Sequence, residues 1–217
     1  MPALIDPRRL PISIVILHLA LVGACTPDPA TLPPGSVLFQ DDFSRRSSGW
    51  PTRQTAQAIL EYEQDHYSMR VLAPDTSTWG TPGLDVGPVR LEVDALHLSG
   101  PDDNLFGLIC RYQDDANFTF LVASSDGFAG IGEYRQGERG LLSGGALLPA
   151  EAIAPRGYNN HLTAECLDDV LRLYVNGRLV AEAPADGPAS GDVGLITGTY
   201  ADPGVEFLFD SFSVQVP

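Results

Sequence analysis

The sequence has 217 residues, of which 44% are hydrophobic and 19% are charged, and its 28 acidic and 13 basic residues give a formal net charge of −15 at pH 7. This composition excludes a mainly disordered chain, which would contain fewer apolar residues. The acidic balance argues against a nucleic-acid partner, because phosphates need a basic face. It also argues against docking onto anionic lipids through charge.

The first 24 residues have the three parts of a secretory signal peptide. Two arginines precede an apolar run from 10 to 22, and the small residues Gly23 and Ala24 follow it. A run of about 13 residues is shorter than the roughly 20 that a helix needs to span a bilayer. We therefore expect residues 1–24 to be a signal that is removed after export.

The residues at the expected cleavage point resemble the bacterial lipobox, in which two small residues precede an invariant cysteine. The resemblance implies that Cys25 is acylated and becomes the first residue of the mature protein. An ordinary secretory signal that contains a cysteine by chance is the alternative. If Cys25 is lipidated, residues 25–35 form a proline-rich tether between the lipid and the folded domain. We expect an extracytoplasmic lipoprotein of the cell envelope, held at the membrane by the lipid anchor on Cys25.

The chain from 36 to 217 is long enough for one folded domain, and its short apolar or alternating runs are separated by turn residues. This pattern predicts an all-β fold. The expected strands span 36–43, 58–63, 66–72, 89–98, 105–112, 118–124, 129–135, 161–167, 170–175, 178–183, 192–197 and 206–216. Such closely spaced strands, with hairpin signals such as Asn176-Gly177, favour an antiparallel β-sandwich of two sheets, or jelly roll. We expect very little helix.

The expected strand 118–124 alternates between an inward and an outward face. Its alternation suggests that Phe118, Phe120 and Val122 point into the core. Leu121 would then make the outer face partly apolar.

Two cysteines remain if Cys25 is lipidated, and they are Cys110 and Cys166. Two is the number that one disulfide needs in an oxidising compartment. The alternation within their strands points both side chains inward, so we expect a Cys110–Cys166 disulfide in the core. Two buried free thiols are the alternative. The spacing excludes a zinc site of the CxxC type.

Four segments occur in an order that is found in a known group of proteins. They are Phe39-Gln-Asp-Asp-Phe43 with Gly49-Trp50, Tyr67-Ser-Met-Arg-Val71, Leu171-Arg-Leu-Tyr-Val-Asn-Gly177 and Phe209-Asp-Ser-Phe-Ser-Val214. The chain resembles the concanavalin A-like lectin/glucanase sandwiches over roughly residues 37–216. Within that group it is similar to bacterial modules related to laminin G-like domains and to the 3-keto-disaccharide hydrolase family (DUF1080). The resemblance implies a jelly roll with one concave sheet, in which glycan binding is common and catalysis is restricted to some branches.

The segment Leu91-Glu-Val-Asp-Ala-Leu-His97 resembles the Glu-x-Asp-x-x-Glu motif of laminarinase-type glycoside hydrolases. In that motif the first Glu is the nucleophile and the last is the acid/base. Here His97 stands at the position of the second Glu, so the acid/base is missing. We assign no catalytic residue and favour a protein that is not an enzyme. Keto-sugar chemistry, which the family name implies, is the alternative.

A glycan site needs exposed aromatic rings together with hydrogen-bonding groups. The residues that we select for such a site lie on outward faces of the expected strands or near loops. They are Arg111, Arg172, Tyr174, Glu92, Asp94 and Tyr134, with Trp79, Tyr158 and Tyr200 as further aromatic candidates. For each one singly, a role in covering a sheet edge or filling a loop cluster is the alternative. Trp50, beside the first strand, is expected in the core.

Asp41, Asp42 and Asp210 lie where the first and last strands should meet. Calcium prefers hard oxygen ligands, so these carboxylates are candidates for a structural calcium site. Acidic residues in ordinary turns are the alternative. We expect no other cofactor.

The sequence predicts a surface-tethered binding module for a carbohydrate or another envelope component. A glycoside-processing enzyme of the same fold is the first alternative. A structural or adhesive envelope subunit that contacts protein partners is the second.

Overall fold

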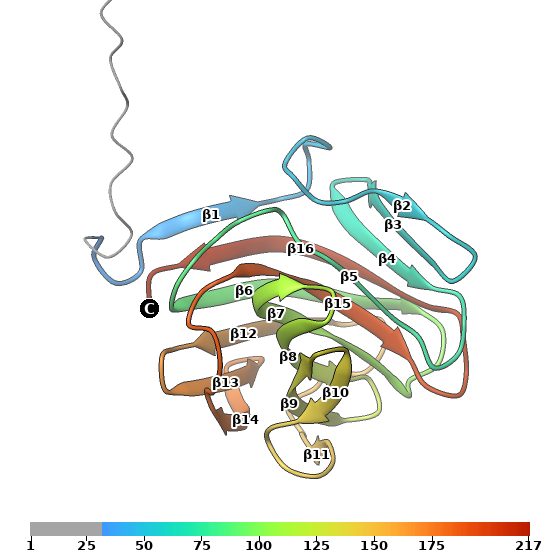
Figure 1. The fold of residues 1–217 in the computed structure, drawn as a ribbon. Coiled ribbons are helices and arrows are strands. Elements are labelled where there is room, and N and C mark those ends of the chain that lie inside the picture. The colour runs from blue at the N-terminus through green and yellow to red at the C-terminus, as the bar shows by residue number, and fades with distance from the viewer. Residues whose placement is uncertain (1–31) are drawn as a thin grey trace, which may run out of the picture.

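A computed structural model describes residues 32–217, which form strands β1–β16 and no helix (Figure 1). The predicted signal peptide, Cys25 and most of the tether lie outside the described residues. No described segment is a helix long and apolar enough to cross a membrane.

Two antiparallel sheets build the domain, which confirms the predicted all-β sandwich. Sheet A has nine strands, in the spatial order β14 (Arg178–Pro184), β13 (Val170–Val175), β12 (Asn159–Cys166), β6 (Val89–Ser99), β16 (Val205–Gln215), β4 (His66–Val71), β3 (Ala58–Glu63) and β2 (Arg53–Gln54), with β1 (Val37–Asp41) paired to β16. Sheet B has seven, in the order β10 (Glu138–Leu141), β9 (Phe128–Arg135), β8 (Asn117–Ser124), β7 (Asn104–Asp114), β15 (Asp192–Thr199) and β5 (Ser77–Gly80), with β11 (Leu148–Pro149) paired to β9.

The strands that the sequence did not predict are β2, β5, β10 and β11. They are two to four residues long and lie at sheet edges or beside them. Segments such as Glu-Arg-Gly-Leu in β10 are too short and too polar to show an alternating pattern. The Asn176-Gly177 hairpin is as predicted, since both residues have positive φ, 51° and 77°, as a type I′ turn requires.

The main core lies between the sheets. Phe106 of sheet B stacks on Phe207 of sheet A with 4.5 Å between ring centroids. Trp50 is 4% exposed and packs edge-on against Phe212, so its predicted core position is confirmed.

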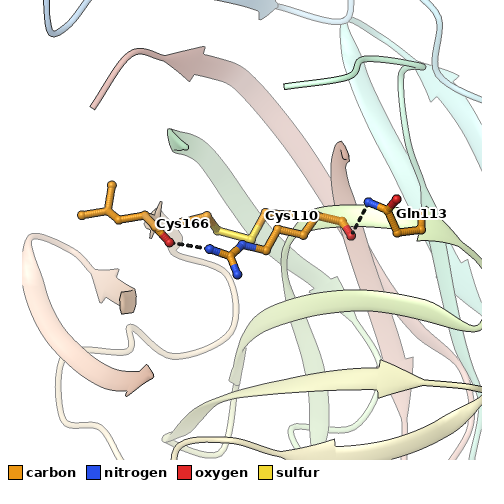
Figure 2. The surroundings of a disulfide bond; sticks show 5 residues. Cys110, Gln113 and Cys166 are labelled. Atoms are coloured by element: carbon orange, nitrogen blue, oxygen red, sulfur yellow. Dashed lines mark hydrogen bonds between the residues drawn. A yellow bond between two sulfur atoms is a disulfide. The ribbon is translucent and has the colours of Figure 1, made fainter. Parts of the chain in front are cut away.

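A disulfide joins the sheets through this core. Cys110 of β7 is bonded to Cys166 of β12, as the cysteine count and the inward faces predict. Figure 2 shows the disulfide with Gln113 nearby, whose side-chain amide donates a hydrogen bond to the carbonyl of Arg111 at 3.4 Å. The same amide also donates to the carbonyl of Ser190 at 2.6 Å. The disulfide therefore links β7 to β12, and Gln113 links the same end of β7 to the loop that precedes β15.

The predicted orientation of strand β8 is wrong. Leu121 is fully buried in the core between the sheets, whereas Phe118, Phe120 and Val122 belong to a second apolar cluster on the outer face of sheet B. Because β8 is apolar on both faces, its alternation did not distinguish inside from outside. The consequence is that rings expected in the core lie beneath a surface.

Candidate functional site

The outer face of sheet B carries the aromatic cluster, which we define as Trp79, Tyr112, Phe118, Phe120 and Tyr134. Phe118 lies at its centre, with ring centroids 5.0 Å from Trp79, 4.7 Å from Tyr134 and 5.7 Å from Tyr112. The two phenylalanines are buried, while the tryptophan and both tyrosines are partly exposed. The cluster thus has an apolar floor and rings at the surface that carry polar N–H and O–H groups.

The separation of the strands shows how far these rings lean toward one another. Trp79 is on β5 and Tyr134 is on β9, and β15, β7 and β8 lie between these strands. At about 4.8 Å per strand, β5 and β9 would be about 19 Å apart in a flat sheet. The two ring centroids are only 5.8 Å apart. Both side chains therefore reach across the intervening strands over the outer face of sheet B.

Asp115, in the turn between β7 and β8, holds two of the rings. Its Oδ1 accepts hydrogen bonds from the indole Nε1–H of Trp79 and the hydroxyl of Tyr112, each at 2.8 Å. Burial, followed by the hydrogen bond to Asp115, raises the pKa of Tyr112 to about 12. Tyr112 therefore stays a neutral donor at physiological pH, and the orientation of both rings is fixed before any ligand arrives.

Two recesses flank the cluster. The first, which we call the Arg111 pocket, has a volume of about 310 Å³ and includes Phe118 and Tyr134 in its lining. The second, the Trp79 pocket, has a volume of about 220 Å³ and is lined by Trp79, Asp115 and polar residues of β2 and β5. Rings between two recesses that contain polar side chains match what a sugar chain requires, apolar faces for stacking and nearby groups for its hydroxyls.

Arg111 sits at a β-bulge of β7, where its φ is 57° and the register with β8 shifts. It is only 5% exposed. Its Nη2 donates a hydrogen bond to the carbonyl of Leu167, and its buried Nε has no partner among the described residues. Burial lowers the pKa of Arg111, and the charge of Asp168 partly offsets this effect.

The other predicted ligand residues lie on sheet A, away from the aromatic cluster. There Arg172 pairs with Glu182 at 2.7 Å and with Glu165 at 3.5 Å, and the hydroxyl of Tyr174 donates to Glu165. Burial raises the pKa of Tyr174. These side chains form a charged ladder that satisfies itself, as on a solvated sheet face.

Glu92 and Asp94 belong to the same ladder. Glu92 pairs with Arg90 at 2.8 Å, and Asp94 lies 2.8 Å from His161. The structure thus brings Arg111 and Tyr134 together and separates them from Glu92, Asp94, Arg172 and Tyr174.

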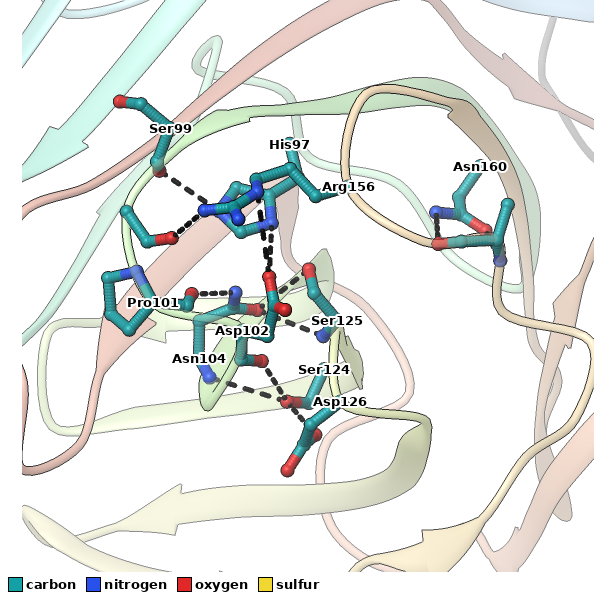
Figure 3. Close-up of polar contacts among 12 residues, drawn as sticks. His97, Ser99, Pro101, Asp102, Asn104, Ser124, Ser125, Asp126, Arg156 and Asn160 are labelled. Atoms are coloured by element: carbon teal, nitrogen blue, oxygen red, sulfur yellow. Dashed lines mark hydrogen bonds and ion pairs between the residues drawn. The ribbon is translucent and has the colours of Figure 1, made fainter.

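His97 points the opposite way from Glu92. Its ring is 1% exposed and stacks on Phe207, with centroids 4.8 Å apart. Its Nε2 contacts the carbonyl of Ser99 at 2.9 Å, and its Nδ1 lies 3.7 Å from Asp102 (Figure 3). Burial lowers its pKa. The motif therefore lacks both the second carboxyl and the shared face that a retaining glycosidase needs.

The serines near His97 form no catalytic pair with it. Ser124 donates to Asp126 and to the carbonyl of Asp102, and Ser125 donates to Asn104 (Figure 3). These bonds fasten the turn after β8 to the start of β7. The contacts of Ser124 and Ser125 in Figure 3 are accounted for by this turn.

The predicted calcium ligands are only partly gathered. Asp41 accepts a hydrogen bond from the N–H of Phe43 through Oδ1, and its Oδ2 is buried without a partner. Asp41 and Asp42 line a recess of about 480 Å³, whereas Asp210 is not part of its lining. Within residues 32–217, no group of three or more His, Cys, Asp or Glu side chains is placed to hold a metal ion. Calcium also accepts backbone and water oxygens, so its presence stays a prediction.

Several site residues were not selected from the sequence. Asp115 lies in Gln113-Asp-Asp-Ala-Asn117, which has the composition of an ordinary hairpin turn, and the sequence alternation places Phe118 in the core. The apolar character of both faces of β8 was the available signal. When both faces of a strand in a two-layer sandwich are apolar, other side chains must pack over the outer face, as the aromatic cluster does here.

The chain is a two-sheet jelly-roll sandwich with an aromatic surface on one outer face. Its sequence matches no protein-family model and no curated protein. Solved structures with a similar fold include the carbohydrate-binding module CBM66 from Bacillus subtilis, with a TM-score of 0.63 and 16% identity over 77% of this chain and 96% of that one.

Two further solved structures have the same architecture. The catalytic domain of an endo-1,3-beta-glucanase (laminarinase) from Thermotoga petrophila has a TM-score of 0.55 and 12% identity over 85% of this chain and 98% of that one. A protein of unknown function with a galectin-like fold from Bacillus subtilis has a TM-score of 0.59 and 12% identity over 85% and 97%. At such identities the likeness establishes the fold.

Proposed function

We propose that this chain is a carbohydrate-binding module whose ligand lies over the aromatic cluster of sheet B. The observation that carries the proposal is the pair of partly exposed rings, Trp79 and Tyr134, which are 5.8 Å apart between two recesses. Asp115 fixes the indole of Trp79, so little side-chain entropy is lost when a sugar stacks on it. Similarity of fold to a carbohydrate-binding module supports the same assignment.

A glycan-array screen of residues 36–217 tests the proposal, followed by titration calorimetry on each glycan that binds. Trp79→Ala and Tyr134→Ala should each weaken binding by about tenfold or more, the usual effect of removing a central aromatic contact. The matched control is Tyr174→Ala, which removes a tyrosine from the outer face of sheet A. Thermal melting of every variant separates lost binding from lost folding.

The result that contradicts the proposal is equally clear. If Tyr174→Ala weakens binding and Trp79→Ala does not, the ligand lies on sheet A. If no glycan binds the folded domain, the alternative of a subunit that contacts envelope proteins gains support.

We further propose that the module is exported and anchored as a lipoprotein through Cys25. Two features support this, the signal-type leader and the Cys110–Cys166 disulfide, which needs an oxidising compartment. Cys25→Ala should leave an unlipidated precursor that no longer partitions into detergent. A variant that partitions like the wild type would contradict the anchor.

A further inference from the structure

The Arg111 pocket differs from an ordinary sugar recess because a buried cation lines it. We propose that this pocket receives the carboxylate of an acidic sugar residue, with Arg111 as the group that recognises it. This inference rests on the proposed function and adds the chemical class of the ligand. The evidence for it is that the buried guanidinium group of Arg111 forms no ion pair with an acidic side chain of the described chain.

No acidic side chain of the described residues forms an ion pair with Arg111, and the charge of Asp168 acts on it from beyond contact distance. No ion pair within 4.0 Å in the described part of the chain includes Arg111. Among the other charged residues that line the pocket, Arg135 and Glu133 pair with each other at 3.0 Å, and Asp186 is exposed. Arginine keeps its proton in proteins, so the cation stays charged in this site. A buried charge of this kind is costly unless an anion pairs with it.

The hydrogen bond from Arg111 to Leu167 does not explain why the residue is charged. It anchors the loop after β12, but its acceptor is a neutral carbonyl. A neutral amide donor could make the same bond. The buried Nε–H of Arg111 has no protein acceptor among residues 32–217. A carboxylate matches the planar fork of a guanidinium and accepts two parallel N–H bonds from it.

The rest of the pocket suits a sugar ring. Phe118 and Tyr134 stack 4.7 Å apart and supply an apolar wall beside the cation. The volume of about 310 Å³ is at the small end of ligand sites, which fits one sugar residue and not a longer segment. A chain that places its acidic residue here can continue over the aromatic cluster toward Trp79.

The acidity of the whole protein gives this site a distinctive salt response. With a net charge of −15, the protein repels a polyanion at long range, and salt screens that repulsion. A contact with the buried Arg111 is screened much less. Affinity for an acidic glycan should therefore stay level or rise with salt, whereas binding to scattered surface arginines would weaken.

The decisive experiment compares acidic glycans with partners that lack only the charge. The probes are a galacturonate tetramer with its carboxyl-reduced form, and sialyllactose with lactose, each titrated calorimetrically into residues 36–217. Losing the carboxylate should weaken binding by about tenfold or more, as expected for hydrogen bonds to a charged group. The pair that shows this loss identifies the sugar as a uronate or a sialate. Equal affinity within both pairs overturns the inference and leaves the proposed function standing, whereas a domain that binds neither acidic nor neutral glycans overturns both.

Variants assign the effect to Arg111. Arg111→Gln should abolish the preference for the acidic member of the pair, and Arg111→Lys, which keeps the charge without the fork, should retain part of it. The control is Arg178→Gln, which removes an exposed arginine from the start of β14 and should leave the preference unchanged. A preference that survives in folded Arg111→Gln protein overturns the inference. If that variant does not fold, the wild-type comparison of charged and carboxyl-reduced ligands decides.

Discussion

Removing the Cys110–Cys166 bond should destabilise the domain by an amount that follows from its position in the chain. The bond closes a loop with a sequence separation of 56 and ties β7 of sheet B to β12 of sheet A. For a loop of this length, the entropic model gives a stabilisation of about 4 kcal/mol. For a domain of this size, each kcal/mol shifts the melting temperature by about 2–4 °C, so the total shift should be about 8–16 °C.

The assay is thermal and urea unfolding of the double variant Cys110→Ala/Cys166→Ala beside the wild type. Both sulfurs are buried, so part of the loss will come from packing. Wild-type protein unfolded with and without reductant separates the two contributions, because reduction alone opens the loop and keeps both sulfur atoms. A melting temperature that changes by less than about 2 °C on reduction would refute the entropic reasoning. Two reactive thiols in the unreduced, unfolded protein would refute the bond itself.

Three further outcomes follow from single positions. Gly107→Ala should lower the free energy of unfolding by about 1–3 kcal/mol, because its Cβ would lie 2.1 Å from the backbone oxygen of Leu121. Gly140→Ala, with open space around the added Cβ, should change it by no more than about 0.5 kcal/mol. Urea unfolding measures both variants, and equal losses would contradict the packing argument. Burial lowers the pKa of His97 below its ordinary value of 6.5, so the unfolded chain binds the proton first, and stability is present above the ordinary pKa and is lost as the pH falls below it. Urea midpoints for His97→Gln should show a flatter pH dependence, and parallel curves would exclude His97 as the cause. If Asp41 helps to hold calcium, adding the ion after chelation should raise the melting temperature of the wild type and not of Asp41→Asn, and no rise in the wild type counts against the site.

The architecture could be predicted from the sequence because the long strands carry strong local signals. In β13, leucine and valine alternate with Arg172 and Tyr174, and Asn176-Gly177 dictates the turn that follows. Each signal lies within a few residues along the chain. Pairing between distant strands then follows from the need to bury one face of each sheet.

The site was less accessible because its residues come from strands that pair at long range. Trp79 and Tyr134 meet over sheet B because β5 and β9 belong to the same sheet, and nothing near Trp79 in the sequence shows this. The bulge at Arg111 interrupts the alternation of the strand, so a two-residue period does not predict on which face of the sheet its side chain lies. Tyr174 and Tyr134 are equally plausible sugar-binding residues in the sequence. In the structure, Tyr174 lies on sheet A beside a ladder of ion pairs, whereas Tyr134 lies in the aromatic cluster of sheet B.

The pairing of β1 with β16 has a consequence for how the domain can be joined to other chains. Val37 lies opposite Gln215, the N–H of Gly35 donates to the carbonyl of Val216 at 2.8 Å, and the N–H of Val216 donates to Ser36 at 2.9 Å. The backbone thus enters and leaves the folded domain at adjacent positions. A few linking residues could circularise it, with new ends opened at the exposed turn 186–189. Because entry and exit coincide, another protein could carry this domain as an insertion within one of its surface loops without separating the ends of that loop.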